Sequence, residues 1–250
     1  MKNYKQLPWQ TEEEFYDLHA ESFFSTGKFY HSNMIGNTDD YFLNYIISKL
    51  NLKPTDNVVD LGCGSGYLVN EINKICNCEG ISTSKKSIEI AKRNFPDCIF
   101  NVADMENFKA KDAVTHFLSL ESIGYSDIKK TLSNVFSQLI DGGIFYVKDT
   151  SIVNNPCKEE QENLVYWTNY WKYKTYTVPE MIHEAYLTGF KLNTFRDLHL
   201  DTRLNIKSFM DTLKNNIIPE KYPYPDYVVH IGTEFIFQKK KREKWVNPYT

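Results

Sequence analysis

A glycine-rich turn at the end of an apolar run limits the folds open to this chain more than any other feature. The run Val58-Val59-Asp60-Leu61 leads into Gly62-Cys63-Gly64-Ser65-Gly66, and apolar residues at helical spacing follow from Tyr67 to Ile75. This order predicts a strand, a tight turn and a helix, because glycine tolerates positive φ and lets a ligand approach the backbone closely. The N-terminus of such a helix also presents free N–H groups. We therefore expect the turn to hold a nucleoside.

Two other glycine patterns that bind nucleotides are absent. The dinucleotide fingerprint needs G-x-G-x-x-G followed by an acid ~20 residues on, and the phosphate loop needs G-x-x-x-x-G-K-[ST]. Asp60-Leu61-Gly62-Cys63-Gly64-Ser65-Gly66 instead resembles motif I of the class I S-adenosylmethionine (SAM) methyltransferases. In that family the turn packs against the amino-acid part of SAM. The resemblance implies SAM as cofactor and S-adenosylhomocysteine as product.

Composition argues against several classes of function. The 250 residues include 29 basic and 32 acidic side chains, a net charge of −3, so we expect no nucleic-acid partner. No apolar run approaches the ~20 residues of a membrane span, and the N-terminus lacks a signal-peptide core. The five cysteines follow no zinc-binding spacing, which indicates reduced thiols and no metal centre. We expect a cytoplasmic protein with a small-molecule substrate, and a homo-oligomer stays open.

Strand and helix patterns alternate after residue 56, which is typical of a doubly wound α/β sheet. The strands are expected at 57–61, 78–82, 98–102, 113–118, 144–148, 190–195 and 227–238. The helices are expected at 66–75, 86–95, 127–139, 179–187 and 201–218. The resemblance implies a Rossmann-like sheet of seven strands, mostly parallel with an antiparallel last strand. Residues 1–50 are expected to form an N-terminal helical lid, and residues 51–250 the methyltransferase domain, with cap insertions near 151–177 and 201–226.

The expected cofactor residues follow the strand ends, because ligands of such sheets bind beyond the carboxyl ends of the strands. Asp60 is expected to orient the turn and the SAM ammonium, or else to stabilise the turn alone. Gly80-Ile81-Ser82-Thr83-Ser84 resembles the G-x-T-x-S pattern of the cyclopropane-synthase-like and prenyl-diphosphate C-methyltransferase branch, in which hydroxyl residues replace a ribose-binding acid. Asp104 resembles the acceptor of the adenine amino group, with Met105 against the ring; the alternative is a turn or capping acid. The expected cofactor-binding residues are Asp60, Gly62, Cys63, Gly64, Gly66, Ser82, Thr83, Ser84, Asp104, Met105 and Leu120.

The segment after the fourth strand should face the transferred methyl group. Glu121-Ser122 with Tyr125 resembles the Glu-Ser-x-x-Tyr segment of geranyl-diphosphate C-methyltransferases and the Glu-Ala-Thr segment of sterol C-methyltransferases. Methyl transfer to an alkene leaves a carbocation that must lose a proton, so Glu121 is the candidate base. The alternative is an acid that caps the following helix. Upstream, Tyr30 and His31 resemble lid residues of the same branch and complete the candidate catalytic set.

Aromatic residues make up 15% of the chain and gather in one segment. Six rings lie within residues 166–176, where the same branch inserts its substrate cap. Aromatic faces stabilise cations, although a cap helix buried by its own rings is the alternative. The candidate substrate residues are Tyr125, Tyr166, Trp167, Tyr170, Trp171 and Tyr176.

The leading interpretation is a SAM-dependent C-methyltransferase that acts on an alkene carbon of an isoprenoid, in particular a prenyl diphosphate. A diphosphate needs cations or Mg²⁺, and the available cations are Lys28, Lys172, Lys174, Arg196 and Arg203. The alternative enzyme is a small-molecule N- or O-methyltransferase of natural-product metabolism, in which Glu121 or His31 acts on a heteroatom. A SAM-binding regulator without catalysis is a third class, against which the acid at the methyl-facing position argues.

Overall fold

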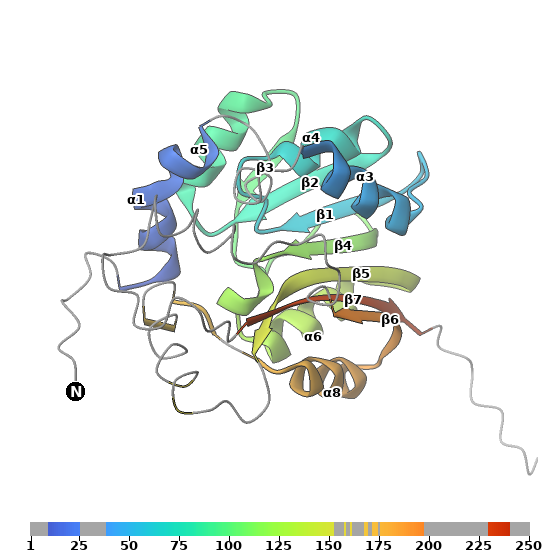
Figure 1. Ribbon diagram of the computed structural model, residues 1–250. Coiled ribbons are helices and arrows are strands. Elements are labelled where there is room, and N and C mark those ends of the chain that lie inside the picture. The colour runs from blue at the N-terminus through green and yellow to red at the C-terminus, as the bar shows by residue number, and fades with distance from the viewer. Residues whose placement is uncertain are drawn as a thin grey trace, which may run out of the picture.

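The structure is a computed structural model that describes residues 10–25, 39–152, 158, 161, 168–169, 172–174, 176–197 and 230–240. Within these residues, seven strands form one sheet in the order β3-β2-β1-β4-β5-β7-β6 (Figure 1). The strands are β1 (Asn57–Leu61), β2 (Asn77–Ser82), β3 (Ile99–Val102), β4 (Val114–Leu120), β5 (Leu139–Ile152), β6 (Phe190–Asp197) and β7 (His230–Lys239). All neighbouring strands from β3 to β5 are parallel, and β7 is antiparallel to both β5 and β6. The expected mostly parallel sheet with an antiparallel last strand is confirmed.

Helices cover both faces of the sheet (Figure 1). They are α1 (Glu12–Phe24), α3 (Asp39–Leu50), α4 (Tyr67–Asn73), α5 (Lys85–Asn94), α6 (Ile128–Gln138) and α8 (Val178–Thr188), with a short 3₁₀ helix, η1 (Ile123–Tyr125). The expected helix at 201–218 and most of the expected aromatic cap lie outside the described residues. No helix among the described residues has both the length and the apolar character needed to cross a bilayer.

Alternate residues of β1 and β4 pack into two separate hydrophobic clusters, one on each face of the sheet. Val58 and Leu118 pack with Ile46 of α3, in a cluster that also includes residues of α4 and α5. Val59 and Phe117 belong to the opposite cluster, under α6 and α8. This arrangement follows from the two-residue period of a strand, which sends neighbouring side chains to opposite faces. A sheet covered on both faces leaves its carboxyl edge as the open place for a ligand.

The glycine turn between β1 and α4 is anchored to the neighbouring strands. The backbone N–H groups of Gly62 and Cys63 both donate to the carbonyl of Ile81, at 2.8 and 3.0 Å. Gly62 and Gly66 have φ of +83° and +82°, a region that favours glycine. A Cβ at Gly66 would lie 2.6 Å from the Phe100 ring, so this glycine also allows α4 to approach the sheet. The turn is therefore held at the carboxyl edge by packing as well as by backbone conformation.

The fifth strand is longer than the sequence predicts. A turn at Asp141-Gly142-Gly143 is expected to precede a short strand at 144–148, but β5 begins at Leu139 and ends at Ile152. Val114 pairs with Leu139 and His116 with Ile144, so the glycines form an irregularity within the strand. The extra length at the other end comes from pairing with β7, which continues to Ile152. Long-range pairing, which no local pattern reveals, sets these bounds.

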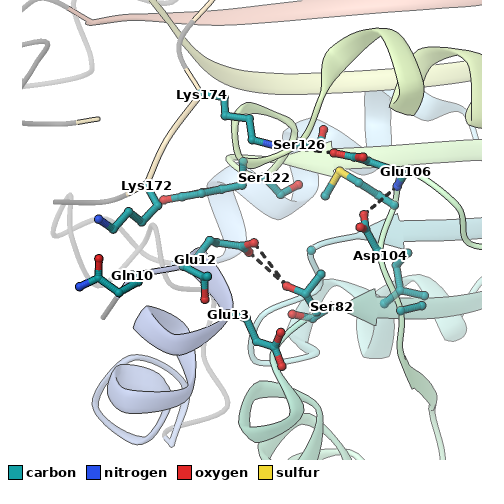
Figure 2. Close-up of a pocket in the computed structure, with 17 residues that line it drawn as sticks. Gln10, Glu12, Glu13, Ser82, Asp104, Glu106, Ser122, Ser126, Lys172 and Lys174 are labelled. Carbon is teal, nitrogen blue, oxygen red and sulfur yellow. Dashed lines mark hydrogen bonds and ion pairs between the residues drawn. The ribbon is translucent and has the colours of Figure 1, made fainter. Parts of the chain in front are cut away.

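Helix α1 is tightly docked on α5. Asp17 of α1 accepts hydrogen bonds from the Ser84 hydroxyl at 2.5 Å and from the Lys86 N–H at 3.1 Å. Glu21 adds a two-bond contact to Arg93, with both distances 3.1 Å. The first turn of α1 thereby contributes Glu12 and Glu13 to the same cavity as Ser82 of β2 and Asp104 after β3 (Figure 2).

Candidate active site

A cavity of about 410 Å³ opens at the carboxyl edge of the sheet (Figure 2). Its lining includes Gly62 after β1, Ser82 and Thr83 at the end of β2, Asp104 after β3 and Ser122 after β4. Its size lies within the ~300–1,000 Å³ that is usual for small-molecule sites. The predicted edge of the sheet therefore carries a cavity, and several predicted cofactor residues meet in it.

The turn after β3 brings Asp104 into the cavity. Its Oδ1 accepts from the backbone N–H of Glu106 at 2.9 Å, so one oxygen stabilises the turn, as the alternative interpretation has it. Among the described residues no donor reaches Oδ2. Met105 also lines the cavity and packs partly against the core under α6 and α8. One face of this turn is thus apolar and the other offers a carboxylate oxygen.

Short hydroxyl side chains follow β2, and each has a different partner. Ser82 Oγ accepts from the N–H of Ser84 at 3.2 Å. Thr83 Oγ1 lies 3.3 and 3.4 Å from the two carboxylate oxygens of Glu12, to which it donates. Ser84 is buried and caps α5, because its Oγ accepts from the N–H of Ser87 at 3.0 Å. Ser82 and Thr83 line the cavity, and Ser84 lies behind it.

Asp60 is buried beneath the glycine turn, with 3% of its surface exposed. Burial raises the pKa of Asp60 to about 7, since no described cation offsets the loss of solvation. Cys63 is also buried, and burial raises the pKa of its thiol. Gly64 lies next to α1, because a Cβ at this position would be 3.1 Å from the Phe24 ring. Asp60, Cys63 and Gly64 therefore belong to the packing around the glycine turn, and none of the three lines the cavity.

Glu121 lies directly after β4 and pairs with Lys148 of β5. Its backbone N–H donates to the Lys148 carbonyl at 2.7 Å, and its carboxylate forms an ion pair with the Lys148 ammonium. The backbone of Glu121 is left-handed, with φ of +53°, which is uncommon for a residue other than glycine. The acid that caps α6 is Asp127, whose Oδ1 accepts from the N–H of Lys129 at 3.0 Å. The helix-capping role considered for Glu121 is therefore filled by another residue. Leu120, its neighbour, packs partly against the core under α3 and α4.

Tyr125 lines the cavity and is connected through Tyr173 to the buried carboxylate of Asp149. Its ring packs edge-on against Tyr173, with centroids 5.1 Å apart, and its hydroxyl accepts from Tyr16 at 3.0 Å. Tyr173 donates to Asp149 at 2.5 Å, and Asp149 also accepts from the Gly124 N–H at 2.9 Å. Tyr176 is buried in the core and does not reach the cavity lining. The remaining aromatic and lid predictions lie outside the described residues: Tyr30, His31, Tyr166, Trp167, Tyr170 and Trp171.

Three of the four carboxylates in the lining were not anticipated from the sequence. Glu12 and Glu13 come from the first turn of α1, and Glu106 follows the β3 turn. The capping box formed by Thr11 and Glu14 marks the start of α1 in the sequence. That local signal does not reveal which part of the sheet the helix covers.

Two lysines also line the cavity. Lys174 lies 3.7 Å from Glu106, and Figure 2 shows it pointing toward that residue. Lys172 points away from Glu106 in the same view. No group of three or more His, Cys, Asp or Glu side chains in the described part of the chain is arranged to hold a metal ion. The cavity lining thus carries two lysines, one of them paired with Glu106, and four carboxylates, Glu12, Glu13, Asp104 and Glu106.

Comparisons with known proteins point to one enzyme class. A family model described as a methyltransferase domain matches residues 52–207. A probable cobalt-precorrin-6B C(15)-methyltransferase of Methanococcus vannielii is 32% identical over 93 residues, which cover 36% of this chain and 51% of that protein. The chain spans about half the length of the curated relatives that it matches.

Solved structures share the fold at low sequence identity. The geranyl diphosphate C-methyltransferase of Streptomyces coelicolor A3(2) superposes with a TM-score of 0.72 at 14% identity, covering 93% of this chain and all of that one. The phosphoethanolamine N-methyltransferase 2 of Haemonchus contortus gives a TM-score of 0.72 at 14% identity, covering 94% of this chain and 61% of that one. At such identities the likeness concerns the fold alone.

The residues around the cavity fit SAM. Asp104 offers a carboxylate oxygen suited to the adenine amino group, beside the apolar surface of Met105. Thr83 and Glu12 provide polar atoms within reach of the end of β2, where nucleotide-binding folds hold the ribose. Gly62 lines the cavity and leaves no room for a side chain, since a Cβ there would lie 2.4 Å from Ser122 Cβ. The lining therefore combines carboxylate and hydroxyl groups with apolar surface, as a nucleoside ligand requires.

Proposed function

This chain belongs to the methyltransferase domain family, and from that premise we propose that it is a SAM-dependent C-methyltransferase. The proposed acceptor is an alkene carbon of an isoprenoid, in particular a prenyl diphosphate. SAM would supply an electrophilic methyl group from its sulfonium. The residues proposed to hold it are Gly62, Ser82, Thr83, Asp104 and Met105, all of which line the cavity.

The observation that carries the proposal is the carboxylate of Glu121 at the end of β4. When a new carbon–carbon bond forms on an alkene, the adjacent carbon becomes a cation. The cation regains neutrality when a neighbouring C–H bond breaks, its electron pair re-forms the alkene and its proton passes to a base. Glu121 is the proposed base. It is not itself among the residues that line the cavity, but it directly precedes Ser122, which is. Its backbone conformation is constrained, and Lys148 holds its side chain in place.

Aromatic and cationic side chains support the same acceptor. Tyr125 lines the cavity and packs edge-on against Tyr173, which donates to Asp149 of β5, and aromatic rings stabilise nearby cations. Lys172 and Lys174 offer partners for a diphosphate. Mg²⁺ is the second way to neutralise a diphosphate, and the experiment below separates the two.

The decisive experiment incubates the purified protein with SAM and a series of prenyl diphosphates of five to fifteen carbons, with Mg²⁺ or with EDTA. Mass spectrometry of the products should show a gain of one methyl group on carbon, with stoichiometric S-adenosylhomocysteine. Turnover in EDTA would show that the lysines are sufficient to bind the diphosphate. Turnover that occurs with Mg²⁺ and is lost in EDTA would show that the metal binds it. S-adenosylhomocysteine release with amines or phenols but with no prenyl diphosphate would refute carbon methylation.

An N-methyltransferase of small amines is the second candidate. It is favoured by the four carboxylates in the cavity lining, Glu12, Glu13, Asp104 and Glu106, which attract a protonated amine. One structural neighbour is named as a phosphoethanolamine N-methyltransferase. The same assay, run with small amines and phosphoamines, separates the two candidates by the atom that gains the methyl group.

A further inference from the structure

The loop after β2 lacks a group that nucleotide-binding folds of this topology commonly use. In such folds an acid near the end of the second strand hydrogen-bonds the ribose hydroxyls. Here the strand ends at Ser82 and continues as Thr83-Ser84-Lys85, with no acid. A hydroxyl side chain alone is a weaker acceptor than a carboxylate. The ribose position of this cavity therefore lacks a carboxylate from the expected segment.

Helix α1 brings a carboxylate to that position from elsewhere in the chain. Both oxygens of Glu12 lie within reach of Thr83 Oγ1, at 3.3 and 3.4 Å, across 71 positions of sequence. Figure 2 shows Glu12 pointing across the cavity toward the end of β2, with the two contacts drawn as dashed lines. Asp104, at the adenine side, lines the same cavity.

The position of Glu12 is imposed by the way its helix is anchored. Thr11 and Glu14 form a capping box that defines the first turn of α1. Asp17, further along the same helix, holds the start of α5 through the Ser84 hydroxyl and the Lys86 N–H. Because α5 begins directly after the β2 loop, these contacts fix the first turn of α1 relative to Thr83.

Glu12 is also kept in an environment that disfavours its charge. Burial raises its pKa to about 7, and the nearby charges of Asp104 and Glu13 act in the same direction. Thr83 and Lys174 oppose the shift without cancelling it. A ligand that brings two hydroxyl donors would supply the hydrogen bonds that this carboxylate lacks.

We propose that Glu12 binds the ribose hydroxyls of SAM and so replaces the acid missing from the end of β2. This assignment rests on the SAM-dependent methyl transfer proposed above, and it adds a binding residue from α1. Thr83 positions the carboxylate, and Asp104 contacts the base at the other end of the nucleoside. Closure of the site by α1 and recognition of the ribose are then properties of the same helix.

The test measures the binding of S-adenosylhomocysteine and of its 2′,3′-dideoxy analogue to the 250-residue chain by calorimetry. The wild-type protein should prefer the natural ligand by about 10- to 100-fold, as expected for hydrogen bonds to a charged group. In Glu12→Gln and Glu12→Ala this preference should fall to about 1- to 5-fold. The matched control is Glu21→Gln, which removes one carboxylate from the same helix at its exposed contact with Arg93 and should keep the full preference.

The two ligands separate a direct contact from a general effect on α1. If Glu12 only fastens the helix, its substitution weakens both ligands equally and the preference is unchanged, which overturns the proposal. An unchanged preference with unchanged affinity overturns it as well. If wild-type protein prefers the natural ligand and Glu12→Gln does not, the ribose contact stands even where no prenyl diphosphate is methylated. Failure of wild-type protein to bind S-adenosylhomocysteine would refute the SAM-dependent function itself.

Discussion

Glu121 and Lys148 are joined twice, by an ion pair between their side chains and by a hydrogen bond from the Glu121 N–H to the Lys148 carbonyl. Lys148 pairs with Leu120 in the register of β4 and β5, so the two charged residues meet where β4 ends. The Lys148 side chain is 8% exposed and that of Glu121 is 20% exposed. The pair therefore holds a carboxylate at the edge of the sheet in a fixed position with limited access to water.

We predict that Glu121→Gln lowers turnover on the best substrate by a factor on the order of 10² to 10⁴ and leaves SAM affinity nearly unchanged. The amide keeps the shape of the side chain and loses its basicity. Asp127→Asn is the matched control, because asparagine caps a helix about as well as aspartate and should keep turnover. Near-normal turnover of Glu121→Gln would make this acid a structural partner of Lys148.

Removal of Lys148 should destabilise the protein through the charge that it leaves behind. We expect Lys148→Met to lower the free energy of unfolding by about 2–4 kcal/mol, because Glu121 would then be a partly buried charge that has lost its cation. The double variant with Glu121→Gln should recover part of this loss. Urea denaturation of all four proteins gives the coupling energy, and additive effects would show that the pair contributes nothing.

Asp104→Ala should weaken SAM by about 1–3 kcal/mol if its free carboxylate oxygen accepts from the adenine amino group. The control ligand is the S-adenosylhomocysteine analogue that lacks the 6-amino group, which should bind wild type and variant alike. Calorimetry measures both. Should SAM affinity hold while stability falls, Asp104 serves only the turn that it forms with the Glu106 N–H.

SAM affinity should rise as the pH rises through about 7, the raised pKa of Glu12. Ribose hydroxyls donate to the ionised carboxylate, so binding lowers its pKa and releases a proton over that range. The charged groups that face Glu12 are Asp104, Glu13 and Lys174. We expect up to about tenfold tighter binding at pH 8 than at pH 6, and a flat profile in Glu12→Gln. An equally steep profile in the variant would exclude Glu12 as the titrating group.

We predict that Asp60 makes the protein less stable as the pH rises, whereas a salt-bridged acid makes a protein more stable as the pH rises. Because burial raises the pKa of Asp60 to about 7, the folded state keeps a proton that the unfolded chain has already released above the ordinary aspartate pKa of 3.8. Stability from this group therefore falls as the pH rises from about 4 to 7. Relative to wild type, Asp60→Asn should gain about 2–4 kcal/mol across that window, measured by urea denaturation at several pH values. A constant difference would show that Asp60 is charged throughout.

Local sequence is a sufficient guide to the centre of this fold. The strand at 57–61 is observed at Asn57–Leu61, and the next helix begins at Tyr67, one residue after the expected start. Alternating apolar residues and punctuating glycines act within a few positions, so these bounds depend little on the rest of the chain. The predicted position of the site at the carboxyl edge follows from the order of the elements.

The residues that complete the site were decided by tertiary structure. The sequence alone determined the strand, turn and helix around Gly62, the α/β alternation and the hydroxyl residues after β2, because each of these features depends on residues that are close together in the sequence. Only folding placed Glu12 beside Thr83 and Lys148 beside Glu121, since these contacts depend on how α1 docks against α5 and how β4 pairs with β5. The burial that raises the pKa of Glu12 is likewise absent from any segment in isolation, because solvent is excluded only when the elements pack together.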